Sequence, residues 1–308
     1  MARTAVLIRS HFVDDALLAM AGRIAAEGVF DVHAVADETR GPLDFGPIPK
    51  VSLTRDLITD LGLYGGAPNL LWRCGDYGLY AARRALPAYD AFWMIEPDVR
   101  LNAGRPSDLL ARFPGPAEVD FLAGRLRVAD PDWDWGFTMD AAAGPVWRCL
   151  FAVTRLSARA IDHLHEARRH ASADHLAAGR DPKLWPNDEA FVATTMARSG
   201  LAMRDLNDFG RVYDEAGLSF WFPLSERELE AGGHDGFIYH PVLRGEAYFL
   251  KLCRLAVRQG ALDALEQIVE RMIGLEWTAE EAKAHRRAID FVRGQQAIGS
   301  AGAPLAAE

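Results

Sequence analysis

The spacing of apolar and polar positions changes repeatedly along the first third of the chain. Short apolar or alternating runs predict strands at residues 4–9, 30–36, 69–73 and 92–95. Between them, apolar residues at helical spacing predict helices over residues 13–27 and 76–84. Strands that alternate with helices in this way indicate an α/β fold, a three-layer domain with a mostly parallel sheet.

The middle of the chain is less regular but continues the alternation of predicted strands and helices. Residues 119–126 and 146–154 are predicted to be strands. A helix is expected to end at Arg198, and a short apolar run covers residues 236–242. We therefore assign residues 1–245 to one domain.

The composition changes after this domain. Amphipathic segments at helical spacing follow, and Thr278 with Glu281 forms a capping box at the start of the last one. We predict a small helical C-terminal appendage over residues 246–294 and a disordered Ala/Gly-rich tail over residues 295–308. The appendage could brace the first domain, form a homodimer or hold an acceptor, and the sequence leaves these roles open.

Charge and cysteine content exclude several classes of protein. The 308 residues carry 34 basic against 43 acidic side chains, a net charge of −9, so the long-range field opposes nucleic-acid binding. Three widely spaced cysteines without a Cys-x-x-Cys pair signal neither a disulfide framework nor a zinc cluster. We see no run long enough to span a membrane and no signal peptide. We expect a cytoplasmic protein, either free or peripheral at the inner face of the membrane.

Residues 89–101 place two carboxylates at the end of an otherwise apolar run. The run is typical of a buried strand, and Glu96 and Asp98 follow where ligands bind in such sheets. Side chains two positions apart in extended chain project to one face, so both could reach one divalent cation or a ribose-phosphate group. The alternative is that Glu-Pro-Asp is an acidic turn that only ends a strand.

Two later segments also carry candidate chemistry. Asp188 and Glu189 start a predicted helix beside Trp185; helix capping explains them, but a carboxylate there could also take a proton from an attacking hydroxyl. His240 follows a strand-like segment and precedes a proline. From that position an imidazole could complete an oxygen-rich metal shell, although a lone histidine is more often structural.

The segment at residues 130–135 alternates tryptophan with aspartate. Indole faces can stack on sugar C–H groups while carboxylates accept hydrogen bonds from hydroxyls, which suits a carbohydrate-binding surface. The same residues suit a loop that is pinned to the core. The sequence does not choose between these two interpretations.

Four segments taken together resemble a bacterial GT-A-type nucleotide-sugar glycosyltransferase. They are Trp72-Arg73-Cys74-Gly75-Asp76-Tyr77, Trp93-Met94-Ile95-Glu96-Pro97-Asp98-Val99-Arg100, Trp185-Pro186-Asn187-Asp188-Glu189 and Tyr239-His240-Pro241. The resemblance implies a Rossmann-related mixed sheet with flanking helices. It also implies transfer of a sugar from a nucleotide-diphosphate donor to a carbohydrate or glycoconjugate acceptor, in bacterial polysaccharide or glycoconjugate synthesis.

The resemblance further implies a role for each site residue. Glu96 and Asp98 match an acidic signature that binds a divalent metal, Mn²⁺ or Mg²⁺, together with the donor's ribose and diphosphate. His240 matches a ligand of that metal, and Asp188, with Glu189 as second choice, matches the catalytic base of inverting members. The candidates for contacts with the nucleotide sugar are Arg9, Asp37, Arg73, Asp76 and Glu96. For the two arginines, a surface salt bridge is the alternative account.

Two other functions remain open at this point. A nucleotidyltransferase on a related fold would carry a Gly-rich basic phosphate loop near the first strand, for which Arg9-Ser10-His11 is a poor substitute. A non-catalytic carbohydrate-binding protein on the same fold would use the acidic pair only as a turn. Binding of nucleoside diphosphates, measured with and without manganese, separates the three functions.

Overall fold

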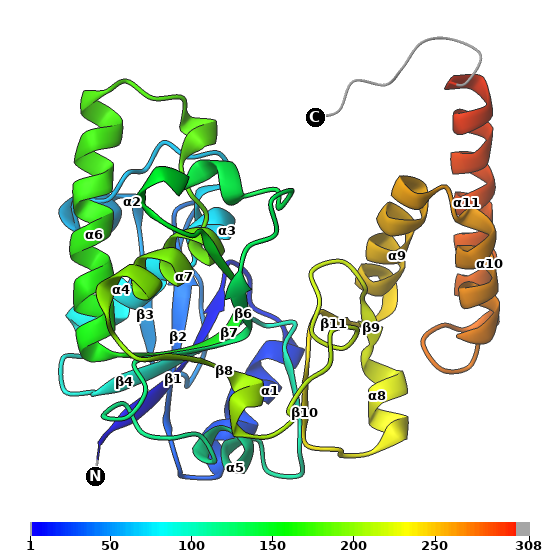
Figure 1. Ribbon diagram of the computed structural model, residues 1–308. Helices are drawn as coiled ribbons and strands as arrows, with labels where there is room; N and C mark the ends of the chain where they lie inside the picture. Colours follow the sequence, from blue (N-terminus) through cyan, green and yellow to red (C-terminus); the bar gives the residue numbers. More distant parts are fainter. Residues whose placement is uncertain (1, 300–308) are drawn as a thin grey trace.

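A computed structural model describes residues 2–299 of the chain, and at its centre lies a seven-stranded sheet of order β3-β2-β1-β4-β7-β6-β8 (Figure 1). Its strands are β1 (Thr4–Ser10), β2 (Asp31–Asp37), β3 (Lys50–Leu53), β4 (Ala91–Ile95), β6 (Phe121–Val128), β7 (Trp147–Ser157) and β8 (Met203–Asp205). Strand β7 runs antiparallel to both neighbours, while the other pairs are parallel. The sheet is therefore mixed, and only one strand departs from the mostly parallel arrangement expected from the pattern.

Helices cover both faces of this sheet. One face carries α2 (Arg55–Asp60), α3 (Leu70–Arg73), α4 (Asp76–Ala85), α6 (Ala158–Ala177) and α7 (Asp188–Ser199), and the other carries α1 (Asp15–Ala26) and α5 (Pro106–Ala111). Successive strand residues point to opposite faces of the sheet. Leu7 of β1 therefore packs in the apolar core on the side of α4, and Ile8 packs in the core on the side of α1. Two apolar cores on either side of one sheet give the predicted three layers.

One predicted strand is wrong. Residues 69–73 contain helix α3, and the strand beside β2 is instead β3, which pairs Val51 with Val35. A run as short as Leu70-Leu71-Trp72 cannot be assigned from periodicity, because strands and buried helical turns share it. The alternation of buried Val51 and Leu53 was the signal for the strand that the prediction missed.

One small sheet connects the segment after β4 to the C-terminal half of the chain, and a second lies within that half. Strand β5 (Arg100–Asn102) pairs antiparallel with β10 (Phe237–Tyr239), and β9 (Leu224–Ser225) pairs with β11 (Val242–Leu243). The amide of Val242 also donates to the carbonyl of Asp98 at 2.7 Å. This pairing carries His240 to the strand end where Glu96 and Asp98 lie.

The last three helices, α9 (Gly245–Gln259), α10 (Leu262–Arg271) and α11 (Ala279–Gly299), follow the short helix α8 (Glu226–Gly232) (Figure 1). These three helices share an apolar cluster of their own. The predicted capping box is present, because Glu281 accepts from the amide of Thr278 at 2.8 Å and its own amide donates back to the Thr278 hydroxyl at 3.2 Å. Helix α11 includes residues 295–299 of the expected tail, and residues 300–308 lie outside the described residues. Within residues 2–299, no helix has the length and apolarity needed to cross a bilayer.

Candidate active site

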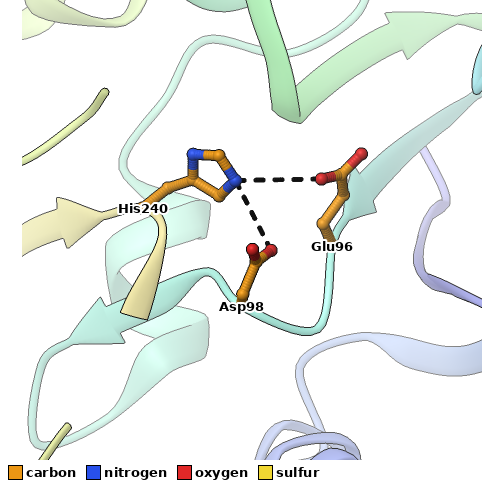
Figure 2. A group of neighbouring side chains, drawn as sticks. All are labelled: Glu96, Asp98 and His240. Atoms are coloured by element: carbon orange, nitrogen blue, oxygen red, sulfur yellow. Dashed lines mark ion pairs between the residues drawn. The ribbon is translucent and has the colours of Figure 1, made fainter. Parts of the chain in front are cut away.

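Glu96, Asp98 and His240 converge beyond the end of β4 (Figure 2). Nε2 of His240 lies 3.4 Å from Oδ1 of Asp98 and 3.8 Å from Oε2 of Glu96. One ligand atom from each side chain lies within 4.8 Å of the other two. The carboxylates meet in a turn, where the amide of Val99 donates to the carbonyl of Glu96 at 3.1 Å, and not in the extended chain that the prediction assumed.

The orientation of His240 suits cation binding. Its Nδ1 lies 2.8 Å from the carbonyl oxygen of Ser219, which can only accept, so Nδ1 carries a hydrogen and Nε2 faces the carboxylates. Burial lowers the pKa of His240, but Asp98 and Glu96 outweigh this effect and raise it. Burial raises the pKa of Asp98, and the imidazole then brings it below its usual value. Two carboxylates and one imidazole nitrogen form a donor set that fits Mn²⁺ or Mg²⁺.

Arg9, at the end of β1, joins this cluster to a second carboxylate. Its guanidinium donates to Glu96 and, at 2.9 Å, to the carbonyl of Leu71. It also lies 3.9 Å from Oδ2 of Asp188. The structure thus brings together Arg9, Glu96 and Asp188, which the sequence placed in three separate segments.

Asp188 is held by backbone groups at the start of α7. The amide of Gly75 donates to its Oδ2 at 2.8 Å, and a Cβ at position 75 would lie 2.6 Å from the same oxygen. A Cβ there would displace the side chains of Asp188 and Arg9, so Gly75 is a positioning residue, and no local pattern marked it as one. Asn187 caps the helix, because its side-chain oxygen accepts from the amide of Ala190 at 3.0 Å.

The two carboxylates that begin α7 differ in their environments. Burial raises the pKa of Asp188 to about 7, with Arg9 opposing this rise and Asp76 and Glu96 adding to it. Burial and the charge of Asp188 raise the pKa of Glu189 well above its usual value. Burial thus disfavours the charged form of both carboxylates, and at Asp188 the guanidinium of Arg9, 3.9 Å away, opposes this effect. This difference favours Asp188 as a base.

The structure corrects the prediction for Asp76. Its side chain is fully buried, and its oxygens accept from the guanidinium of Arg168 at 2.7 and 3.1 Å and from the hydroxyl of Tyr80 at 2.7 Å. A carboxylate in this position cannot contact a nucleotide. No local pattern marked Arg168 as its partner, because the pair forms between two helices that lie far apart in the sequence.

The remaining nucleotide candidates lie at or behind the same edge of the sheet. Arg73 is buried, and its Nη1 faces the carbonyls of Pro182, Lys183 and Trp185 at 3.2–3.3 Å, so it braces the segment before α7. These hydrogen bonds engage Nη1 alone, and a contact of Arg73 with the diphosphate stays a prediction. Asp37 lies half-buried at the end of β2, where its Oδ1 accepts from the amide and the hydroxyl of Thr39 at 3.0 and 2.6 Å. It stays a candidate for contact with the nucleoside.

Asp76→Asn is expected to lower the free energy of unfolding by about 3–5 kcal/mol, because the Arg168 guanidinium stays buried without a counter-charge. Urea titration measures this change as a lower midpoint at a constant slope. The matched control is Asp162→Asn, whose exposed pair with Arg83 at 3.0 Å is worth less than about 1 kcal/mol. Similar losses in the two variants would contradict a special role for the buried pair.

Likeness to known proteins is found among solved structures. No protein-family model and no curated protein matches this sequence. Among solved structures, the chain is similar to a glycosyltransferase involved in the glycosylation of the major capsid of PBCV-1, with 11% identity and a TM-score of 0.36 over 78% of this chain and 91% of that one. At this level of similarity the chemistry has to be argued from the side chains of this chain.

Proposed function

We propose that this chain is a metal-dependent glycosyltransferase of the GT-A type, which moves a sugar from a nucleotide-diphosphate donor to an acceptor hydroxyl. The observation that carries the proposal is the convergence of Glu96, Asp98 and His240, whose ligand atoms lie within 4.8 Å of one another beyond the sheet edge. Residues 1–245 would form the catalytic domain, and the helices after it would serve a separate role. A bacterial origin and a cytoplasmic or peripheral location belong to the same proposal.

Glu96, Asp98 and His240 would hold the cation together with the donor's diphosphate. Bound there, Mn²⁺ or Mg²⁺ would act as a Lewis acid that neutralises the charge developing on the departing nucleoside diphosphate. The hydrogen bond from Nδ1 of His240 to Ser219 keeps Nε2 directed at this position. Arg9, which contacts Glu96 and sits beside Asp188, would orient Glu96 and add positive charge near the leaving group.

Asp188 would accept the proton of the attacking hydroxyl. A general base works best when its pKa lies near the operating pH, and burial raises the pKa of Asp188 to about 7. The amide of Gly75, at 2.8 Å from Oδ2, fixes where that carboxylate points. Glu189 would lie behind it, with its Oε1 accepting from the amide of Phe151 at 3.4 Å.

Calorimetry with nucleoside diphosphates tests this proposal directly. We expect at least one of UDP, GDP, ADP and dTDP to bind about tenfold more tightly with MnCl₂ than with EDTA, which corresponds to about 1.4 kcal/mol. The matching nucleoside monophosphate is the control, because it lacks the second phosphate that would share the cation. No binding of any nucleotide would contradict the proposal and favour a carbohydrate-binding protein. Metal-enhanced binding of triphosphates alone would favour a nucleotidyltransferase.

A further inference from the structure

Trp72 is exposed within a segment that is otherwise tied to the candidate active site. The carbonyl of Leu71 accepts from Arg9 at 2.9 Å, and the amide of Gly75 donates to Asp188 at 2.8 Å. Between these two contacts, Arg73 is buried against the segment before α7. Trp72 lies between the anchored residues Leu71 and Arg73, and it is 66% exposed. Its backbone is therefore held beside the site while its indole faces solvent.

A second tryptophan from a distant loop meets it there. Trp135 lies between β6 and β7, and its ring centroid is 6.1 Å from that of Trp72, with the planes 57° apart. The guanidinium carbon of Arg73 lies 4.7 Å from the centroid of the Trp135 ring, a cation–π contact. Because Arg73 is also bonded to the segment before α7, the contact fixes Trp135 relative to the helix that carries Asp188. We call Trp72 and Trp135 the tryptophan pair.

We infer that the tryptophan pair is the acceptor subsite of the proposed glycosyltransferase and that it binds a neutral saccharide. Indole faces stack on the C–H faces of pyranose rings. A single exposed tryptophan is common on protein surfaces, but two tryptophans held together beside a candidate base indicate a binding site. The neighbouring Asp132 and Asp134 are exposed carboxylates, which accept hydrogen bonds from sugar hydroxyls and repel an anionic acceptor. The inference rests on the proposed function, since it assigns the acceptor to the same site.

The test compares four variants of the full chain. They are Trp72→Ala, Trp135→Ala, the conservative Trp72→Phe and the control Phe137→Ala, which removes a 67%-exposed aromatic ring from the same loop. Lactose, maltose and cellobiose are the probes, each titrated against intrinsic tryptophan fluorescence and against release of nucleoside diphosphate from the donor. Donor hydrolysis without added saccharide is measured in parallel, because it does not need the acceptor subsite.

At least one of the disaccharides is expected to change the fluorescence and to stimulate nucleotide release in wild type and in Phe137→Ala. In Trp72→Ala and Trp135→Ala, the saccharide concentration at half-effect should rise about tenfold, while Trp72→Phe should lose less because it keeps a stacking face. Hydrolysis and metal-enhanced nucleotide binding should stay near wild type in all four. A saccharide effect that changes equally in Phe137→Ala, or no response to any probe in wild type, would overturn the inference.

Two outcomes separate this inference from the proposed function. Weaker nucleoside diphosphate binding in Trp72→Ala, with saccharide binding intact, would place the tryptophan pair on the donor side and refute the acceptor assignment. A wild-type protein that responds to saccharide but binds no nucleotide would refute the glycosyltransferase proposal and, with it, the assignment of an acceptor. The same nucleotide titration therefore distinguishes failure of the acceptor assignment from failure of the glycosyltransferase proposal.

Discussion

Asp98→Asn is expected to abolish the metal enhancement of nucleoside diphosphate binding and to slow turnover of the donor about 10³-fold. A Lewis acid at the leaving group is worth several kcal/mol of transition-state stabilisation, and each 1.36 kcal/mol is tenfold in rate. The amide keeps the shape of the side chain but loses the charge that faces Nε2 of His240 at 3.4 Å. Calorimetry with and without MnCl₂, together with hydrolysis of sugar nucleotides, measures both effects.

The control for this variant is Asp60→Asn, at the exposed end of α2, which should leave both measurements unchanged. The two changes remove the same charge from the chain, so a loss specific to Asp98 reports on its position. Equal turnover by wild type and Asp98→Asn would remove Asp98 from the site. Slower turnover with metal enhancement intact would show that residues other than Asp98 hold the cation.

Asp188→Asn is expected to lower kcat/KM for sugar transfer about 10²- to 10⁴-fold, the range for loss of a general base. The pH dependence of kcat/KM is the stronger test. Only the ionised carboxylate can accept a proton, and burial raises the pKa of Asp188 to about 7. Wild-type kcat/KM should therefore rise with pH below about 7, level off above it, and lose this dependence in Asp188→Asn. The measurement is transfer at saturating metal between pH 5 and 9.

Glu189→Gln is the matched control, because it changes the adjacent residue by the same chemistry. Burial and the charge of Asp188 raise the pKa of Glu189 well above its usual value and so favour its uncharged form. Replacement by a neutral amide should therefore cost little rate and leave the pH dependence intact. If Glu189→Gln loses the rate and Asp188→Asn keeps it, Glu189 is the base and the ranking is reversed. Metal-enhanced nucleotide binding should persist in both variants, since neither carboxylate belongs to the cation cluster.

Local patterns predicted most of the secondary structure for a physical reason. The period of apolar residues reports which faces of a segment are buried, and β1, α1, β2, α4 and β4 all lie within a residue or two of their predicted bounds. The failure at residues 69–73 has the same origin, since a run of so few apolar residues has no period to read. The antiparallel direction of β7 could not be read from its own residues, because pairing depends on the neighbouring strand.

Local patterns in the sequence predicted only part of the candidate site. The acidic pair could be predicted because it directly follows an apolar run, and that position alone placed it at the sheet edge where ligands bind in such folds. Asp76 looked equally available in the sequence, yet it lies buried against Arg168, 92 positions away. A polar residue that begins a helix can face solvent, substrate or core, and its own neighbours in sequence do not decide which.

Local patterns suffice to predict the α/β order of the elements and the place of Glu96 and Asp98 at a strand end, because periodicity and strand boundaries are local properties of the chain. Contacts between distant segments are needed to bring His240 to that pair, to bring Arg9 to Asp188, and to turn Arg73 and Asp76 inward. These relations depend on β10 pairing with β5 and on α7 packing against the sheet. Contacts between distant segments are set by how buried faces fit together, which no single segment encodes.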